Sequence, residues 1–208
     1  QSGAYPKWLI IFAYLIVYII WGSTYLAIRF SVETIPPLLS GGIRFLAAGA
    51  ILLCVRLLQT RDLPTARGWK LAFGASLLPF AVTYGLITTA EIVVPSSIAG
   101  LIAAIEPLWF CLIGWLFFDG YAGIALGFAG ICLLIAGDPN VELSFESKYT
   151  LWVLLLLLST LTWVVGAFIS ANPRIHKDFL TASGMQMLCG GTVMMVSQYA
   201  LSLFTGNY

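Results

Sequence analysis

The chain has 208 residues, of which 60% are hydrophobic and only 9% are charged, and its formal net charge is +1. In a soluble domain roughly a quarter of all residues are charged. This composition therefore excludes a soluble globular protein and indicates an integral membrane protein. The small net charge, without a basic patch, argues against nucleic acid as a partner. The four cysteines lie in apolar segments without a metal-binding spacing, and no metal or cofactor is expected.

Apolar stretches long enough to cross a bilayer follow one another along the chain. A hydrocarbon layer of about 30 Å needs a helix of about 20 apolar residues. Such stretches are found at 8–29, 38–58, 70–90, 95–118, 121–137, 150–171 and 180–204. The sequence therefore predicts an all-α polytopic membrane protein with seven transmembrane helices, in direct contact with the lipid bilayer.

The basic residues between these stretches gather on one side of the predicted bundle. Seven of the ten lie before the first span, in the second connection or in the sixth: Lys7, Arg56, Arg61, Arg67, Lys70, Arg174 and Lys177. Positively charged loops stay on the cytoplasmic side. We therefore expect a multi-pass protein of the cell membrane with a cytoplasmic N-terminus.

A faint internal repeat appears when the chain is shifted by 142 residues. This shift superposes Trp21 on Trp163, Gly42 on Gly184 and Gly49 on Gly191. Five predicted spans separate the two copies, and an odd number reverses their orientation in the membrane. Inverted repeats of this kind occur in many secondary transporters, which bind substrate near the midplane. Residues 8–137 would form one five-helix repeat and 150–204 the first two helices of an inverted second repeat; chance similarity between Trp- and Gly-rich helices is the alternative.

The fourth span contains one acid in an otherwise apolar helix. Glu106 lies about 16 Å along the helix from Pro95, near the middle of the bilayer. A charge at this depth costs several kcal/mol unless it is protonated, paired or hydrated, which makes Glu106 a candidate functional residue. Pro107 removes a backbone hydrogen bond beside it and should bend the helix. The alternative is a packing acid that is hydrogen-bonded to a neighbouring helix.

Polar and aromatic side chains recur on one face of several predicted helices. Tyr14, Tyr18, Trp21 and Tyr25 are spaced by three or four residues in the first span. Together with residues of other spans they predict an aromatic-walled cavity that binds a small-molecule substrate. The full set of substrate-binding candidates is Tyr14, Tyr18, Trp21, Tyr25, Arg44, Tyr84, Thr88, Glu91, Glu106, Trp109, Trp163 and Gln186. The alternative for each residue is a hydrogen bond that joins two helices.

The sequence predicts different surroundings for three basic side chains. Arg44 lies roughly 10 Å inside the second span and needs a partner there, either Glu91, Glu106 or a substrate carboxylate. Arg29, at the outer end of the first span, is expected to reach toward the membrane interface. His176, in the sixth connection, is expected to face water.

Several segments, read in chain order, resemble the first half of an EamA-type transporter of the drug/metabolite transporter superfamily. They are Trp21-Gly-Ser-Thr-Tyr-Leu-Ala-Ile-Arg29, Pro36-Pro37, Gly42-Ile-Arg44-Phe45, Ala90-Glu91, Val94-Pro-Ser-Ser-Ile-Ala-Gly-Leu101 and Ile105-Glu106-Pro-Leu-Trp109. The resemblance covers residues 8 to 137, and the last two spans resemble the start of the second repeat of that family. Carried over by position, it implies that Trp21, Tyr25, Tyr84, Glu91, Glu106 and Trp109 face a cavity.

The resemblance also implies ten helices in two inverted five-helix repeats and a central cavity through which metabolites, often amino acids, leave the cell. It places the protein in a bacterial inner membrane, although a plastid envelope protein without its transit peptide would show the same pattern. This sequence stops three helices short of that plan, and its link between the fourth and fifth spans is short. It is therefore either a part of a transporter or a chain whose cavity a second copy completes, so monomer and homodimer are both open.

The sequence predicts a secondary active transporter that exports small amphipathic metabolites such as amino acids by alternating access. The alternatives are proton-coupled efflux of cationic drugs or metabolites, and a non-transporting membrane scaffold or channel. An enzyme is not expected, because the spans contain no nucleophile with a base and no metal cluster. Phosphorylated substrates are disfavoured because Arg44 is the single buried cation.

Overall fold

The structure of the chain is a computed structural model, and it describes residues 6–118 and 148–205. The described residues are helical, and six of their helical stretches are long and apolar enough to cross a membrane. These six agree with six of the seven predicted spans and confirm the all-α membrane fold. The fifth predicted span, 121–137, lies outside the described residues.

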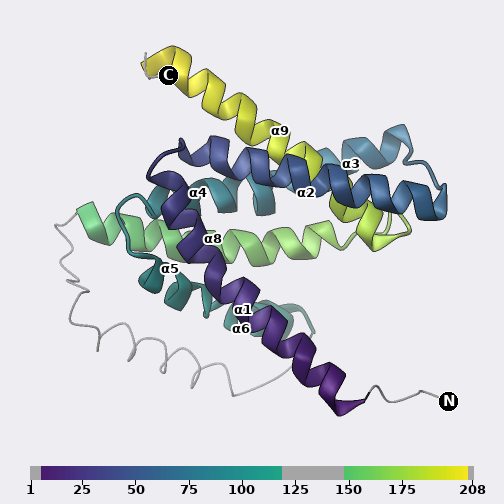
Figure 1. The fold of residues 1–208 in the computed structure, drawn as a ribbon, viewed down its shortest axis with the longest axis horizontal. Helices are drawn as coiled ribbons and strands as arrows, with labels where there is room; N and C mark the ends of the chain where they lie inside the picture. The colour runs from purple at the N-terminus through teal and green to yellow at the C-terminus, as the bar shows by residue number, and fades with distance from the viewer. Residues whose placement is uncertain (1–5, 119–147, 206–208) are drawn as a thin grey trace.

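The first two spans are long single helices, α1 (Lys7–Val32) and α2 (Pro37–Thr60). The third span consists of α3 (Ala66–Ser76), the π-helix η1 (Leu77–Val82) and α4 (Thr83–Ala90). The fourth consists of α5 (Ser96–Ala103) and α6 (Glu106–Phe118). After the undescribed stretch, α8 (Lys148–Ser170) and α9 (Phe179–Thr205) complete the fold (Figure 1).

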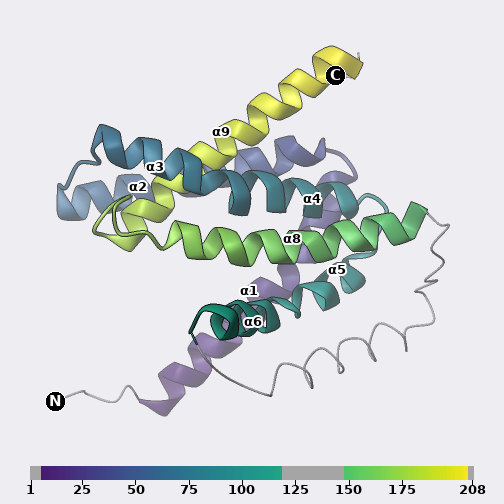
Figure 2. The same ribbon diagram turned by 180° about the vertical axis from the view of Figure 1, so that it is seen from behind.

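A proline explains the π-helical turn in the third span. Pro79 has no N–H group to donate, so a regular α-helical hydrogen bond is missing at this point. Helix α8 runs beside η1 and α4 (Figure 2), and a Cβ atom on its Gly166 would lie 2.7 Å from Cδ of Pro79. The widened turn therefore coincides with the place where α8 packs directly on the proline ring.

The fourth span breaks directly before its acid. Helix α5 ends at Ala103 and α6 begins at Glu106, so Pro107 occupies the first turn of α6. Proline is well tolerated there, since the first N–H groups of a helix have no intrahelical acceptor. The bend expected near Pro107 is thus present as an interruption, and it places Glu106 at a helix N-terminus.

Helices α2 and α9 are antiparallel and meet through glycines. A Cβ atom on Gly42 would lie 3.2 Å from the carbonyl oxygen of Gly191, and one on Gly49 would lie 2.9 Å from that of Gly184. Small residues of this kind allow two helix backbones to approach closely in a membrane. A separate buried cluster joins α1, α4, α5 and α8 around Tyr25, and this cluster forms one side of the candidate site.

Candidate functional site

Two cavities adjoin the middle of α1. The first has a volume of about 340 Å³ and is lined by residues of α1, α4, α6 and α8. The second has a volume of about 880 Å³ and lies among α1, α5, α6 and α8. Four residues line both cavities, namely Trp21, Tyr25, Glu106 and Trp163. These four side chains define the candidate site.

Glu106 is the only charged residue among the described residues that line either cavity. Its side chain is nearly enclosed, with a relative exposure of 8%. It begins α6, and the partial positive charge of a helix N-terminus favours a carboxylate near it. The acid therefore faces both cavities from the first residue of α6.

Two tryptophans from different parts of the sequence flank this acid. Trp21 comes from α1 and Trp163 from α8, and both lie in the walls of both cavities. The Trp163 ring packs edge-on against Tyr84, with centroids 5.9 Å apart. Aromatic walls with few polar groups are typical of sites that bind small amphipathic molecules.

Arg44 is stabilised by aromatic rings instead of by an acid. Its guanidinium carbon lies 4.8 Å from the centroid of Tyr84 and 5.0 Å from that of Phe45. Cation–π contact of this kind is favourable at partly desolvated sites. No acid among the described residues lies within 4 Å of Arg44, so neither Glu91 nor Glu106 forms an ion pair with it. The third expected partner, a substrate carboxylate, stays a prediction.

The predicted site residues divide into those that line a cavity and those that do not. Tyr18 lines the second cavity and Tyr84 the first, beside the four shared residues. The remaining predicted residues line neither: Tyr14, Arg44, Thr88, Glu91, Trp109 and Gln186. Sequence reasoning did not include Thr24, Ser96 and Ser97, which do line the cavities; Thr24 follows Trp21 by three residues, so helical spacing alone would have found it.

Several of the residues outside the cavities make hydrogen bonds within or between helices. Thr88 donates to the carbonyl oxygen of Tyr84 at 2.7 Å, within one helix. Trp109 donates to Thr160 of α8 at 2.9 Å. Gln186 of α9 donates to the carbonyl oxygen of Ser170 at 3.2 Å. Tyr14 has 59% of its surface exposed. The bonds of Trp109 and Gln186 match the alternative role of hydrogen bonds that join two helices, whereas the bond of Thr88 stays within its own helix.

Arg29 ties α1 to the turn between α4 and α5. Its Nη1 atom donates to the carbonyl oxygens of Glu91 and Ile92, the latter at 2.8 Å. These carbonyl groups lie in a turn between two spans, and the Arg29 side chain is 34% exposed, so the expectation that it reaches toward the membrane interface stays a prediction. The Glu91 side chain lies wholly buried in the same turn.

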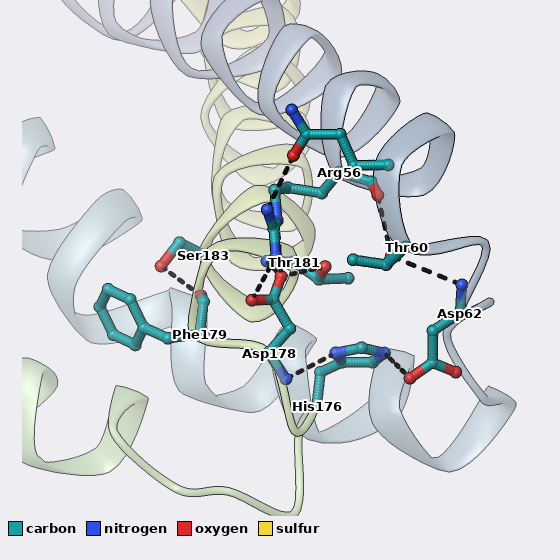
Figure 3. A network of polar contacts seen from close by, with 9 residues as sticks. Arg56, Thr60, Asp62, His176, Asp178, Phe179, Thr181 and Ser183 are labelled. Carbon is teal, nitrogen blue, oxygen red and sulfur yellow. Dashed lines mark hydrogen bonds and ion pairs between the residues drawn. The ribbon is translucent and has the colours of Figure 1, made fainter.

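At the other end of the bundle a polar network joins α2 to the start of α9 (Figure 3). Arg56 donates to both carboxylate oxygens of Asp178, at 3.0 and 2.9 Å. Asp178 also caps α9, because it accepts from the N–H and the hydroxyl of Thr181 at 2.9 and 2.6 Å. The hydrogen bonds from Arg56 and Thr181 hold the pKa of the Asp178 carboxyl well below its usual range.

His176 belongs to the same network. Its Nδ1 atom accepts from the backbone N–H of Asp178 at 3.0 Å, and its Nε2 atom lies 3.6 Å from a carboxylate oxygen of Asp62. Its side chain is only 8% exposed, so the expectation that it faces water was wrong. The residue connects the α2–α3 link with the segment before α9.

Membrane-length helices around cavities that contain a single buried acid are typical of polytopic membrane proteins that bind small molecules. A sequence model described as the EamA-like transporter family matches residues 8–136. The match covers more than half of the chain, which therefore belongs to the EamA-like transporter family.

Curated relatives carry transporter names. The chain is 37% identical over 188 residues to "Uncharacterized inner membrane transporter YedA" of Escherichia coli (strain K12). The matched region covers 87% of this chain and 59% of that protein. It is 25% identical over 193 residues to "Uncharacterized transporter YvbV" of Bacillus subtilis (strain 168), covering 90% and 62%. It is 27% identical over 200 residues to "Probable amino-acid metabolite efflux pump" of Salmonella typhimurium, covering 92% and 62%. The chain thus spans about three fifths of the length of these relatives, and no solved structure matches it significantly.

Proposed function

We propose that this chain works as a secondary active transporter, or as the larger part of one, and that it exports small amphipathic metabolites such as amino acids by alternating access. The observation that carries the proposal is the position of Glu106. It is buried, it is the only charged lining residue of the described cavities, and it lies in the wall of both. An ionisable group inside a membrane protein is retained mainly for binding or for proton transfer.

The wall composition supports an amphipathic substrate. A protonated amino group would pair with the Glu106 carboxylate, and an apolar side chain would pack against Trp21 and Trp163. The name of the Salmonella typhimurium relative, an amino-acid metabolite efflux pump, agrees with this class. As a transporter the protein would catalyse no chemical reaction, so we expect no enzymatic activity.

A second candidate is proton-coupled efflux of organic cations. The observation in its favour is that Arg44 does not line either cavity, so the described cavities offer no cation to the carboxylate of an amino acid. A cation with an apolar body needs only the acid and the aromatic rings. The two candidates differ in whether the substrate must carry a carboxylate.

The contact between α2 and α9 supports the proposed repeats, 8–137 and 150–204. The 142-residue shift relates Gly42 to Gly184 and Gly49 to Gly191. In the structure Gly42 meets Gly191 and Gly49 meets Gly184. If each glycine is replaced by its counterpart under the shift, the first contact becomes the second and the second becomes the first. Two equivalent helices with this contact pattern are related by an approximate two-fold axis. Such an axis between inverted repeats is the usual basis of alternating access.

We further propose a bacterial inner membrane location, with the N-terminus and the Arg56–Asp178 contact on the cytoplasmic side. The distribution of Lys and Arg residues supports this orientation. The oligomeric state, monomer or homodimer, would be measured on the purified protein.

Counterflow in proteoliposomes tests the function. Vesicles loaded with an unlabelled amino acid mixture should take up a labelled amino acid transiently, and Glu106→Gln should abolish this uptake. Glu33→Gln, which changes an exposed acid at the end of α1, is the matched control and should leave it intact. Uptake of tetraphenylphosphonium instead of amino acids would favour the organic-cation candidate. Non-saturable flux without counterflow would indicate a channel, and no flux of any probe would refute the transporter.

A further inference from the structure

The polar network of Figure 3 joins α2 and α9 at one of their two ends. Arg56 of α2 donates two hydrogen bonds to the carboxylate of Asp178, and the two side chains are only 23% and 26% exposed. His176 adds a second connection, because it accepts from the Asp178 N–H and lies 3.6 Å from Asp62 in the α2–α3 link. Paired hydrogen bonds between a guanidinium and a carboxylate are among the stronger polar contacts in proteins. They hold the end of α2 against the start of α9.

The same end is also closed by apolar packing. Leu53 of α2, Ala72 of α3, Ile175 before α9 and Met185 of α9 belong to one buried cluster. A Cβ atom on Gly68 of α3 would lie 2.5 Å from the carbonyl oxygen of Ile175. The α8–α9 link is therefore in backbone contact with α3, directly beside the polar network in the sequence.

The opposite end of the α2–α9 pair lacks the residues for such a network. The 142-residue shift takes Arg56 to Gln198 and Asp178 to Pro36. Pro36 precedes α2 just as Asp178 precedes α9, so the shift relates equivalent positions. Gln198 carries no charge and the side chain of Pro36 has no polar atom. The ion pair therefore has no counterpart at the other end, although the two helices are otherwise related by the approximate two-fold axis.

The two helices touch at their glycines and differ in packing on either side of them. Between the two ends, Gly42 meets Gly191 and Gly49 meets Gly184. Beyond these contacts the C-terminal end of α9 projects past the other described helices (Figures 1 and 2), and Tyr199 there is 64% exposed. Small residues at a crossing let one helix move against another. The glycine contacts are thus suited to act as a pivot between a closed end and a less packed end.

A movement of α9 would reach the candidate site through α8. Gln186 of α9 donates to the carbonyl oxygen of Ser170, the last residue of α8, at 3.2 Å. Trp163, on the same helix, lines both cavities. The start of α9, the end of α8 and one wall of the cavities are therefore connected.

We propose that the Arg56–Asp178 pair, supported by His176, is a latch that keeps α2 and α9 closed at this end in the resting protein. Opening this end breaks the pair, and the helices pivot about their glycines, which brings their other ends together. In the proposed orientation the latched end is cytoplasmic, so the resting cavity is accessible from outside. The inference rests on the proposed alternating access and deepens it by naming the contact that sets the resting state. Its test measures distances between helices and needs no substrate.

Electron paramagnetic resonance of the full chain in lipid nanodiscs tests the latch. The four native cysteines are replaced by alanine, and spin labels are attached at two pairs of exposed positions, Leu58 with Phe179 at the latched end and Ile35 with Tyr199 at the other. Asp178→Asn removes the charge, while asparagine still caps a helix. It should raise the ratio of long to short distances at the latched pair at least about fivefold. The second pair should become shorter, and Arg56→Gln should have the same two effects.

Lys177→Gln is the matched control. It removes an exposed charge next to Asp178, and this lysine makes no hydrogen bond or ion pair within the part of the chain that the structure describes, so both distances should stay as in the wild type. Circular dichroism should show that each variant is folded.

Two results would overturn the latch. One is an unchanged distance between the labels at Leu58 and Phe179 in both variants that lack the ion pair. The other is a longer distance there without the shortening at the opposite pair, which would show local fraying of the helix ends instead of a pivot. Because no flux is measured, failure of the latch is distinct from failure of counterflow, which concerns the transporter proposal itself.

Discussion

Gly49 of α2 and Gly184 of α9 each face the backbone of the other. A Cβ atom on Gly49 would lie 2.9 Å from the Gly184 carbonyl oxygen, and one on Gly184 would lie 3.3 Å from the Gly49 carbonyl oxygen. The two helices are in backbone contact here, and the neighbouring atoms belong to main chains that cannot rotate away. This contact joins the two parts of the chain that the 142-residue shift relates.

Gly49→Ala should therefore destabilise the protein. The added methyl group meets the Gly184 oxygen and the backbone nitrogen of Leu188, both at 2.9 Å, so the helices must move apart at a cost of about 1–3 kcal/mol. Gly74→Ala is the matched control, because nothing lies within 4 Å of its Cβ position. Thermal unfolding in detergent should show a lower midpoint for Gly49→Ala only. Equal midpoints for both variants would show that the helices are not in contact at Gly49.

Loss of either tryptophan at the site should weaken substrate binding. Trp21→Ala and Trp163→Ala each remove a large aromatic surface from both cavities, and we expect about a tenfold higher dissociation constant for each. Trp8→Ala, at the exposed start of α1, is the control. Isothermal titration with the amino acid or organic cation that is transported would measure the change. Unchanged affinity in both variants would remove the cavities from the binding site.

The ion pair between Arg56 and Asp178 should make stability depend on acid pH. The pKa of the Asp178 carboxyl is lowered in the folded protein from its ordinary value of 3.8, so the folded state binds this proton less well than the unfolded state. The stabilisation is present above pH 3.8 and is lost as pH falls below it. Asp178→Asn should lower the unfolding midpoint at neutral pH and have a smaller effect in acid. A double-mutant cycle with Arg56→Gln measures the pair itself, and additive effects of the two changes would show that it contributes nothing.

Glu91 should give the opposite pH dependence. Burial raises the pKa of this carboxyl from 4.5 to about 8 in the folded protein, so the folded state holds the proton more tightly than the unfolded state. Its contribution to stability is complete below pH 4.5 and is lost as the pH rises through about 8. The unfolding midpoint of the wild type should fall across this range, whereas Glu91→Gln, which stays neutral, should show a smaller fall. Glu33→Gln should follow the wild type; a wild type without the fall would mean that Glu91 is ionised when folded.

The sequence determined the membrane fold and the depth of the acid. Spans of about 20 apolar residues have no other stable arrangement in a bilayer than the helix, because every backbone group needs an internal partner. The fixed rise of the helix then placed Glu106 near the middle of its span, and Pro107 beside it indicated the break. Six of the predicted spans and this break are present in the described residues.

Only the tertiary structure decided which polar residues reach a cavity. Tyr14 and Tyr25 belong to the same predicted face of α1, yet Tyr25 is buried beside two cavities and Tyr14 is exposed. The reason is that α5, α2 and α4 pack on only part of that helix. In the same way Arg44 contacts aromatic rings, and the buried Glu91 carboxyl group has no hydrogen-bond partner within residues 6–118 and 148–205. Helical periodicity fixes which residues share a face, but the rotation and crossing of the helices fix what that face meets.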